Sequence, residues 1–460
     1  MSVTFYIEQF GCRATQADAA AIERQLLDSG CAPAADRDSA EFVVVNTCTV
    51  TAAADAEARD SIRRIHARNP AARIIATGCY AQRAPQDLAA LPGVSRVVGN
   101  SHKAEIAALI RDPGFIPVDK IASAPRAAAC PPGSPLSDPF SDPFSDKILC
   151  GDIFAHSHFL SAPVLGGERQ HTRPTLKIQD GCNLRCSYCV IPFVRGKSHS
   201  MPPDQVVEEI ARLSSRGFRE VVLSGINLGT WGRDLSPRAG LLELLRRLLE
   251  ETRLERLRLS SIEPQDVTLD LIDLFGSTPR LAEHFHMPLQ SGSDGILAAM
   301  HRWYRTAHYA RRLELIRERL PHAAIGADVI AGFPGESEAD HVLTLDFIER
   351  LPFTYLHVFS YSARPGTEAA LAGNQVPARV IKRRARELRA LGEAKSAAFR
   401  RSQIGRTLRV LTLGRDPAKL ASTPALSSNY LRVELGGLFA PNAFHDVRIG
   451  EARDALLLAG

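Results

Sequence analysis

Three cysteines stand close together near the middle of the chain. Cys182, Cys186 and Cys189 have the spacing C-x3-C-x2-C and follow Gly181. A short loop of this kind can hold three corners of a cubane iron-sulfur cluster through its thiolates. One iron is then left without a protein ligand, and it could chelate the amino and carboxylate groups of S-adenosylmethionine (SAM). Electron transfer from the reduced cluster would break a carbon-sulfur bond of SAM and give a deoxyadenosyl radical.

A zinc site is the competing interpretation of these three cysteines, with inert burial as a second. Zinc sites of this class usually present paired C-x2-C units and four ligands, and no fourth cysteine lies nearby in the sequence. We therefore predict that Cys182, Cys186 and Cys189 are catalytic and bind a radical-generating cluster.

Three further cysteines follow apolar segments in the first part of the chain. The first 115 residues alternate expected strands, at 3–8, 42–46, 73–77 and 94–98, with helical patterns. Such alternation indicates a parallel sheet, whose ligands collect outside the carboxyl ends of the strands. The thiols of Cys12, Cys48 and Cys79 should therefore converge at one sheet edge. They could bind a second cluster, or they could be small core residues.

The other cysteines are not expected to bind metal. The chain has nine in all and no export signal, so its thiols should stay reduced. We expect Cys31 to be packed at the end of a helix, and Cys130 and Cys150 to lie in a linker.

A second alternating series follows at 171–398. Six expected strands alternate with five helical patterns, which indicates an α/β architecture with a partial (β/α)6 barrel. The strands are expected at 175–179, 220–224, 256–260, 284–287, 325–331 and 355–360, and the helices at 203–216, 241–251, 267–275, 304–319 and 336–350.

Polar groups in the loops after these strands are candidates for binding SAM, because barrel chemistry belongs to that end. Gly225 and Asn227 could approach the SAM amino group or form a plain turn. Gly332, in Gly-Phe-Pro-Gly-Glu, could shape the adenine pocket or serve as turn chemistry. Glu263 and Gln290 stand after two other strands. Arg195 could pair with SAM, with substrate charge or merely with a surface carboxylate.

Two histidines on one expected strand, His284 and His286, complete the polar candidates. We place them on opposite faces of that strand, in packing roles rather than around one metal.

The remaining segments differ in composition. Residues 116–170 are rich in Pro, Ser and Ala and are expected to form a linker or insertion. Residues 399–460 contain short expected strands, at 408–413, 430–434 and 444–449, and should form a small all-β barrel. Before and within that segment basic residues crowd together, which suits a phosphate backbone or a solvated helix face. They are Arg379, Lys382, Arg383, Arg384, Arg386, Arg389, Lys395, Arg400, Arg401, Arg406 and Arg409.

Length and composition set the broad class. A chain of 460 residues is too long for one core, so several domains are expected. Hydrophobic content of 45%, charged content of 23% and a net charge of +5 are ordinary for a soluble protein. The sequence has no apolar run of the ~18 to 20 residues that a membrane span needs, and we expect a cytoplasmic protein without a membrane partner.

The motifs together resemble the radical-SAM methylthiotransferase family, over nearly the whole chain. Gly-Cys-Arg at 11–13, Asn-Thr-Cys-Thr-Val-Thr at 46–51, Thr-Gly-Cys-Tyr-Ala-Gln at 77–82 and the cysteine loop at 179–189 carry the resemblance. It implies an N-terminal domain at 1–115 that binds an auxiliary 4Fe-4S cluster, a radical-SAM core at 171–398 with a second 4Fe-4S cluster, and a TRAM-like RNA-binding module at 399–460. Two SAM molecules per turnover are implied, one as methyl donor and one as radical source.

The N-terminal motifs look like the branch that acts on N6-threonylcarbamoyladenosine beside the anticodon, at adenine C2. The expected partners are a tRNA anticodon stem-loop, a low-potential electron donor such as flavodoxin or ferredoxin, and a sulfur donor. Unpaired anticodon-loop bases can be splayed into a pocket. The alternatives are methylthiolation of isopentenyladenosine in tRNA, of a ribosomal-protein aspartate, or a redox-sensing Fe-S protein that only binds RNA.

Overall fold

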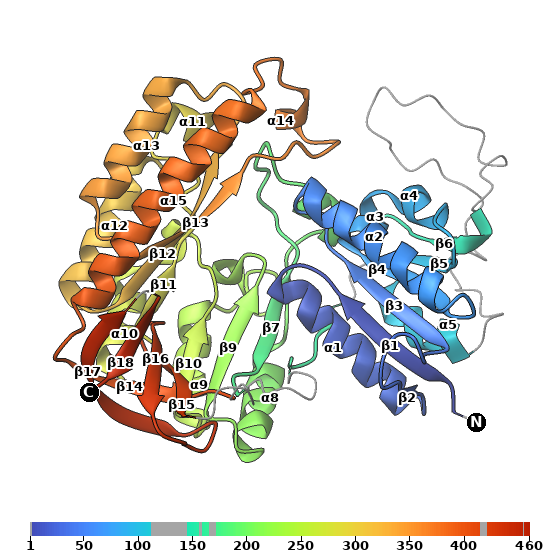
Figure 1. Ribbon diagram of the computed structural model, residues 1–460, viewed down its shortest axis with the longest axis horizontal. Coiled ribbons are helices and arrows are strands. Elements are labelled where there is room, and N and C mark those ends of the chain that lie inside the picture. Colours follow the sequence, from blue (N-terminus) through green and yellow to red (C-terminus); the bar gives the residue numbers. More distant parts are fainter. Residues whose placement is uncertain (1, 112–144, 156–158, 165–171, 415–420, 454) are drawn as a thin grey trace. The chain divides into compact units, whose positions relative to one another are not determined.

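The computed structural model describes residues 2–111, 145–155, 159–164, 172–414, 421–453 and 455–460 (Figure 1). Most of the expected linker at 116–170, including Cys130, lies outside the described residues. The chain forms two compact units. The N-terminal unit comprises Met1–Ala162, Asp180–His199 and Ser362–Ala370, and the barrel unit comprises Pro163–Gln179, Ser200–Tyr361 and Leu371–Gly460. Among the described helices, none combines the length and the apolarity that a membrane span requires.

A parallel sheet forms the core of the N-terminal unit. Its strand order within the described residues is β2-β1-β3-β4-β5-β6. The strands are β1 (Thr4–Gln9), β2 (Ala32–Pro33), β3 (Phe42–Thr47), β4 (Arg73–Gly78), β5 (Val94–Gly99) and β6 (Ile148–Leu149). The expected parallel sheet is confirmed.

Helices cover both faces of this sheet. They are α1 (Arg13–Asp28), α2 (Ala52–Arg68), α3 (Cys79–Arg83), α4 (Pro85–Ala89), η1 (Lys103–Glu105) and α5 (Ile106–Arg111). Alternate residues of β3 point to opposite faces, so Val44 packs in the core under α1 and α5, while Val45 packs in the core under α2 and α4. Burial on both faces explains why the first four residues of β3, 42–45, are all apolar.

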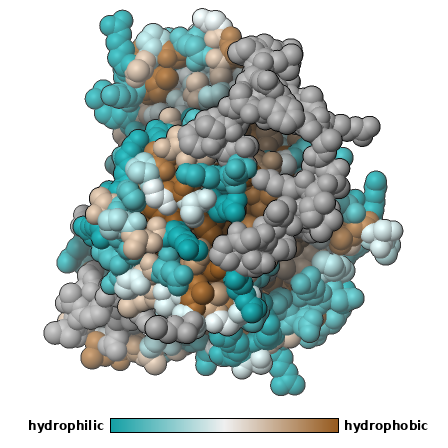
Figure 2. Space-filling model, turned by 90° about the vertical axis from the view of Figure 1, so that its right-hand side faces the viewer, coloured by the Kyte–Doolittle hydropathy of each residue, from teal (hydrophilic) through white to brown (hydrophobic). Residues whose placement is uncertain are grey.

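The N-terminal unit also contains two segments from later in the sequence. One holds the cysteine loop and the short helix α7 (Ile191–Arg195), and the other holds the start of α14 (Glu368–Leu371). Large apolar side chains of this unit that remain exposed include Val50, Phe154 and Phe193. Figure 2 shows the face of the molecule that lies on the right-hand side in Figure 1. Hydrophobic residues gather near the middle of this face, and hydrophilic residues lie along much of its outline.

Parallel strands and helices alternate through the first part of the barrel unit. The strands are β7 (Thr175–Asp180), β8 (His199–Ser200), β9 (Glu220–Gly225), β10 (Arg256–Leu259), β11 (His284–His286), β12 (Ala324–Ala331) and β13 (Tyr355–Ser360). They pair in the orders β10-β9-β7-β8 and β11-β12-β13, and parallel bridges from Leu257 to Leu281 and from Ser261 to His286 join β10 to the region of β11. This arrangement confirms the expected partial barrel.

The helices of this part follow the expected positions closely. They are α8 (Pro203–Ser215), α9 (Leu241–Glu251), α10 (Leu269–Ser277), α11 (Asp294–Ala299), α12 (Thr306–Arg319) and α13 (Glu338–Arg350), with 3-10 turns η3 (Leu228–Thr230) and η4 (Pro264–Asp266). Among the described helices of this part, the short helix α11 and the two 3-10 turns were not expected.

The long basic helix α15 (Ala378–Arg401) lies alongside α13 and leads into a closed five-stranded barrel (Figure 1). Within the described residues its strand order is β14-β15-β16-β18-β17. The strands are β14 (Thr407–Thr412), β15 (Ser422–Ser427), β16 (Arg432–Gly436), β17 (Phe444–Arg453) and β18 (Leu456–Ala459). A TRAM-like module is therefore confirmed, with β15 and β18 in addition to the expected strands.

A buried ion network docks the C-terminal barrel onto β9 and β10. Glu220 accepts hydrogen bonds from Arg256 (2.5 Å) and Arg258 (2.9 Å), and all three side chains are buried. The same guanidinium groups donate to the carbonyls of Leu426 and Ser427 on β15. Burial alone would raise the pKa of Glu220, but Arg258 and Arg256 hold it below its usual range.

We expect Glu220→Gln to loosen this docking by about 3–5 kcal/mol, because it leaves two buried guanidinium groups without their counter-ion. Amide hydrogen exchange in β14 to β16 measures the change locally. Since the folded-state pKa lies below the ordinary 4.5, the stabilisation is present above that pH and is lost as pH falls below it. The half-exposed Glu255, which pairs with Arg409, gives the control: Glu255→Gln should cost less than about 1 kcal/mol. Equal exchange in both variants would contradict the assignment.

Candidate functional site

Cys12, Cys48 and Cys79 each follow the carboxyl end of a strand. Cys12 precedes α1, Cys48 follows β3 and Cys79 begins α3, and the strands β1, β3 and β4 are parallel neighbours. Burial raises the pKa of Cys48 to about 11, the thiols of Cys79 and Cys12 add to the effect, and Arg195 opposes it. The three residues therefore follow the ends of neighbouring parallel strands at one edge of the sheet, where the sequence analysis expected them. Such a set fits an iron-sulfur cluster, whose irons would favour the thiolates.

Gly11 lets the backbone before Cys12 pass close to the side chain of Cys48. Its φ of +95° lies in the left-handed region, and a Cβ added to it would stand 2.5 Å from Cys48 Cβ and 2.7 Å from Cys48 Sγ. A side chain at residue 11 would therefore collide with a candidate ligand and strain the backbone.

We expect Gly11→Ala to lower the iron bound at the N-terminal cysteines by more than half while SAM cleavage by the loop cysteines persists. Iron analysis and product assay on anaerobically reconstituted protein measure the two effects separately. Gly30 offers the matched control, since its φ is also positive but its Cβ would meet no atom within 4 Å. If Gly30→Ala lost as much iron, the effect would reflect backbone strain and not the cysteine contact.

Asp55 organises the loop that carries Cys48. Its carboxylate accepts hydrogen bonds from Thr49 (2.7 Å), Arg83 (2.9 Å) and Arg364 (2.9 Å). Arg364 also donates to the carbonyl of Thr49 at 3.0 Å. Arg364, more than 300 positions away in the sequence, therefore holds Thr49 in place, which is the residue directly after Cys48.

The loop that carries Cys182, Cys186 and Cys189 is held by backbone contacts. The amide of Cys182 donates to the carbonyl of Gly196 (3.1 Å) and that of Cys189 to the carbonyl of Cys186 (3.0 Å). Gly181 has φ +70°, and a Cβ there would stand 1.9 Å from the carbonyl oxygen of Lys197. Only glycine lets the chain pass this point, which explains the residue before the first cysteine of the loop.

Arg195 is buried in a four-residue charge network within the N-terminal unit. It donates to Asp180 (2.9 and 3.0 Å) and Asp18 (3.0 Å), and Lys103 Nζ lies 3.0 Å from Asp18 and 3.7 Å from Asp180. The carboxylates on either side of Arg195 raise its pKa well above the ordinary value despite its burial. Of the roles considered for Arg195, the structure shows pairing with carboxylates, which are buried and not at the surface. A contact between Arg195 and SAM stays a prediction.

Asn100 connects Cys79 to α7, the helix that follows the cysteine loop. Its amide donates to the carbonyl of Val194 in α7 (2.7 Å) and lies 3.6 Å from Cys79 Sγ. Cys79 also packs with Val190 and Val194. Cys31 is buried in the core next to α1, and Cys150 Sγ lies 3.8 Å from the carbonyl of Gln82.

The sequence analysis missed several of these residues. Asp18 is charged but stands between Ala14 and Ile22 on the buried face of α1, four positions from each. A charge at an apolar position of an amphipathic helix is a signal that could have found it. Asp55 carries the same signal, because it lies on the buried face of α2 with Ala58 and Ile62. Lys103 and Asn100 carry no comparable signal.

Asn227 and Gly225, in the barrel unit, surround the side chain of Gln179. Gln179 Oε1 accepts from the Asn227 amide at 2.7 Å, and a Cβ at Gly225 would stand 2.8 Å from the same oxygen. The Oδ1 atom of Asn227 is buried without a hydrogen-bond partner. A buried acceptor left open fits a ligand with an amino donor, such as the methionine part of SAM.

Glu263 and Gln290 differ in what holds them. Glu263 forms an ion pair with Arg302. Gln290 has φ +66°, unusual for a residue with a side chain, and its backbone pairs with Asp328 and Ile330. Their contact with SAM stays a prediction.

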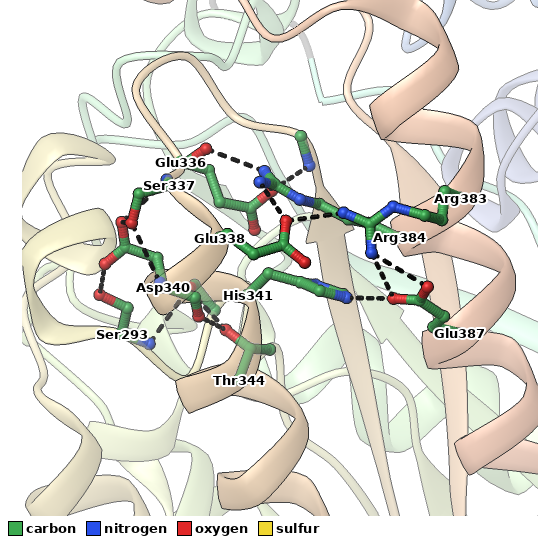
Figure 3. A network of polar contacts seen from close by, with 12 residues as sticks. Ser293, Glu336, Ser337, Glu338, Asp340, His341, Thr344, Arg383, Arg384 and Glu387 are labelled. Carbon is green, nitrogen blue, oxygen red and sulfur yellow. Dashed lines mark hydrogen bonds and ion pairs between the residues drawn. The ribbon is translucent and has the colours of Figure 1, made fainter.

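Gly332 follows β12 and contacts a polar network whose members Glu336, Arg383 and Arg384 are labelled in Figure 3. Its amide donates to Glu336 (2.7 Å), and the buried Arg384 donates to both the carbonyl and the carboxylate of Glu336, each at 2.8 Å. Arg384 and Arg383 also reach Glu338. The Gly-Phe-Pro-Gly-Glu turn is therefore fixed by Arg384, and Arg383 pairs with Glu338 at the start of α13; the sequence analysis considered both arginines for phosphate binding.

Comparison with known proteins decides the family. Residues 4–99 match the model described as Uncharacterized protein family UPF0004, and residues 176–348 match the Radical SAM superfamily. A threonylcarbamoyladenosine tRNA methylthiotransferase of Aquifex aeolicus is 35% identical over 95% of this chain and 97% of its own. The chain belongs to the radical-SAM methylthiotransferase family. It is thus a transferase, and members of this family use SAM and a 4Fe-4S cluster.

Other family members at similar identity have different names. A Bacillus subtilis relative, 34% identical over 85% of this chain and 80% of its own, is also a threonylcarbamoyladenosine tRNA methylthiotransferase. A Syntrophobacter fumaroxidans relative, 35% identical over 84% and 79%, is a tRNA-2-methylthio-N(6)-dimethylallyladenosine synthase. Identity therefore shows the family of tRNA-modifying methylthiotransferases without choosing the nucleoside.

Among solved structures, the radical SAM methyltransferase TsrM of Kitasatospora setae has a TM-score of 0.55 at 17% identity, over 80% of this chain and 77% of that one. At that identity the likeness concerns the fold alone.

Proposed function

We propose that this methylthiotransferase adds a methylthio group to C2 of N6-threonylcarbamoyladenosine in tRNA. The observation that carries the proposal is the presence of both cysteine trios in one compact unit of a family member. The choice of nucleoside rests on the N-terminal motifs and on the Aquifex relative, whose alignment spans almost both full chains.

In this proposal the loop thiols of Cys182, Cys186 and Cys189 hold one cluster and leave an iron for SAM. The bound group supplies a radical able to abstract hydrogen from an unactivated aromatic carbon. The open Oδ1 of Asn227 supports a role in accepting a hydrogen bond from the SAM amino group. The buried ion pairs of Arg195 with Asp18 and Asp180 hold the cysteine loop in position and balance the charge of Arg195.

Cys12, Cys48 and Cys79 hold a second 4Fe-4S cluster, which handles the sulfur. Cys48 and Cys79 are buried, and burial raises the pKa of both thiols, whereas Cys12 is exposed. A bound iron would favour the thiolate form that burial alone opposes. The proposal also requires a low-potential electron donor and a sulfur donor.

The tRNA is bound by the C-terminal barrel and by the exposed side of α15. Arg379, Lys382, Arg386 and Arg389 are exposed and follow one another at spacings of three and four, which places them on one helix face. A row of cations at this spacing suits a phosphate backbone.

Mass spectrometry of tRNA nucleosides from a deletion strain tests the choice of substrate. The methylthio derivative of N6-threonylcarbamoyladenosine should disappear and return with the wild-type gene. Loss of the dimethylallyladenosine derivative instead would assign the protein to the other named branch. Unchanged nucleosides would leave the ribosomal-protein aspartate or a redox-sensing RNA-binding role, and would overturn the proposal.

A further inference from the structure

We propose that His286, Asp328 and His357 bind one divalent metal ion of the zinc type, separate from the clusters held by cysteine. The three side chains belong to β11, β12 and β13 of the barrel unit. Each offers one ligand atom, and these atoms lie within 4.8 Å of one another. Two imidazoles and one carboxylate are a common ligand set for such metals.

Strand register brings the three residues together. His286 is paired with Gly326, which stands two positions before Asp328 and therefore on the same face of β12. Asp328 is paired with His357 on the next strand. The three side chains therefore project from one face of neighbouring strands. Our placement of His284 and His286 on opposite faces was wrong for the same reason, since residues two positions apart share a face, and both rings stack on Tyr355.

The two separations between histidine nitrogen and aspartate oxygen match those between the ligands of a tetrahedral ion. His286 Nε2 and His357 Nδ1 each lie 3.3 Å from the same oxygen, Asp328 Oδ1. Ligand atoms about 2.0–2.2 Å from a zinc ion stand roughly 3.3–3.5 Å apart in a tetrahedron. The same distances are longer than a strong charged hydrogen bond, which is about 2.7–2.9 Å.

The surroundings of His286 are compatible with a metal-ligating tautomer. Its Nδ1 lies 2.6 Å from Ser261 Oγ, and its buried Nε2 faces Asp328 Oδ1 at 3.3 Å. With Nδ1–H donated to the serine, Nε2 carries a lone pair toward Asp328. Two acceptors would then face each other, and a cation between them removes the repulsion. Ligating histidines usually donate their other N–H in this manner.

Burial differs across the cluster in a way that suits ion entry. The His286 side chain is 8% exposed and that of Asp328 22%, whereas His357 is 54% exposed. Tyr355 stacks on His286 at 5.8 Å with an interplanar angle of 7°, and its hydroxyl lies 2.7 Å from His284 Nε2. Two ligands are therefore held in place and the third faces an open side.

Zinc binding to the cluster-loaded enzyme tests the proposal. The protein is reconstituted anaerobically with iron and sulfide so that its cysteines are occupied, passed over a chelator, dialysed against Zn²⁺ and assayed for zinc and iron. We expect about one zinc per chain, with nitrogen and oxygen scatterers in zinc-edge X-ray absorption. Asp328→Asn and His357→Gln should each lose at least tenfold in zinc affinity at unchanged iron content.

The exposed His308 supplies the matched control, and His308→Gln should retain zinc. His357→Gln guards against misfolding as the cause of any loss, because its side chain is largely exposed. Wild-type protein that binds no zinc, zinc bound through sulfur, or equal binding by Asp328→Asn would each overturn the proposal. In those cases a shared proton would hold the three side chains. The result is independent of the substrate proposed above, because zinc is measured without tRNA.

Discussion

Cys186→Ala should reduce reductive cleavage of SAM by more than about 100-fold while leaving iron at the N-terminal cysteines. Loss of partners that only orient a metal ligand already costs about 10–100-fold, so removal of a ligand should cost more. Cys186 is the middle thiol of the loop, and its carbonyl accepts the amide of Cys189 at 3.0 Å, so that the two residues form one turn. The product is measured as deoxyadenosine after anaerobic reconstitution and reduction.

The control for this experiment is Cys31→Ala. Cys31 is buried in the apolar core of the N-terminal unit, and no role at a cluster is assigned to it. That variant should keep both the iron content and the cleavage rate. Cleavage that survives in Cys186→Ala would mean that the radical site lies elsewhere.

Cys48→Ala should have the opposite profile. It removes a ligand of the N-terminal cluster, so methylthiolated nucleoside should fall by more than about 100-fold while deoxyadenosine formation continues. The bound iron should drop by about four per chain. The tRNA product and the deoxyadenosine are measured in the same reaction, because only their ratio separates the two clusters.

Three results would contradict the second prediction. Loss of both activities would indicate that Cys48 supports the loop cysteines through the shared unit. Unchanged methylthiolation would remove the N-terminal cysteines from sulfur handling. Unchanged iron would assign them to packing, the interpretation that sequence alone left open.

The alternation of apolar strands and amphipathic helices was enough to predict both α/β regions. The strands β3 and β13 are encoded by local patterns of hydrophobic residues, and each begins at the predicted residue. The strand β15 was missed because it contains Pro424 and several polar residues, which weaken a strand signal.

Long-range pairing explains most of what sequence did not reveal. Arg195 and Asp18 are 177 positions apart, and Arg364 and Asp55 are 309 apart. No local periodicity encodes such partners. The basic residues near the C-terminus have two different environments. Arg383 and Arg384 form ion pairs with carboxylates, whereas Arg386 is exposed. A helix of this composition could not be divided without knowing which face meets α13.

The metal content of wild-type protein purified without oxygen tests the central claim most directly. We expect a brown protein with about eight irons per chain, equivalent to two cubane clusters, and deoxyadenosine release when SAM and a reductant are added. Zinc bound by sulfur in place of that chromophore, with no deoxyadenosine released, would contradict it.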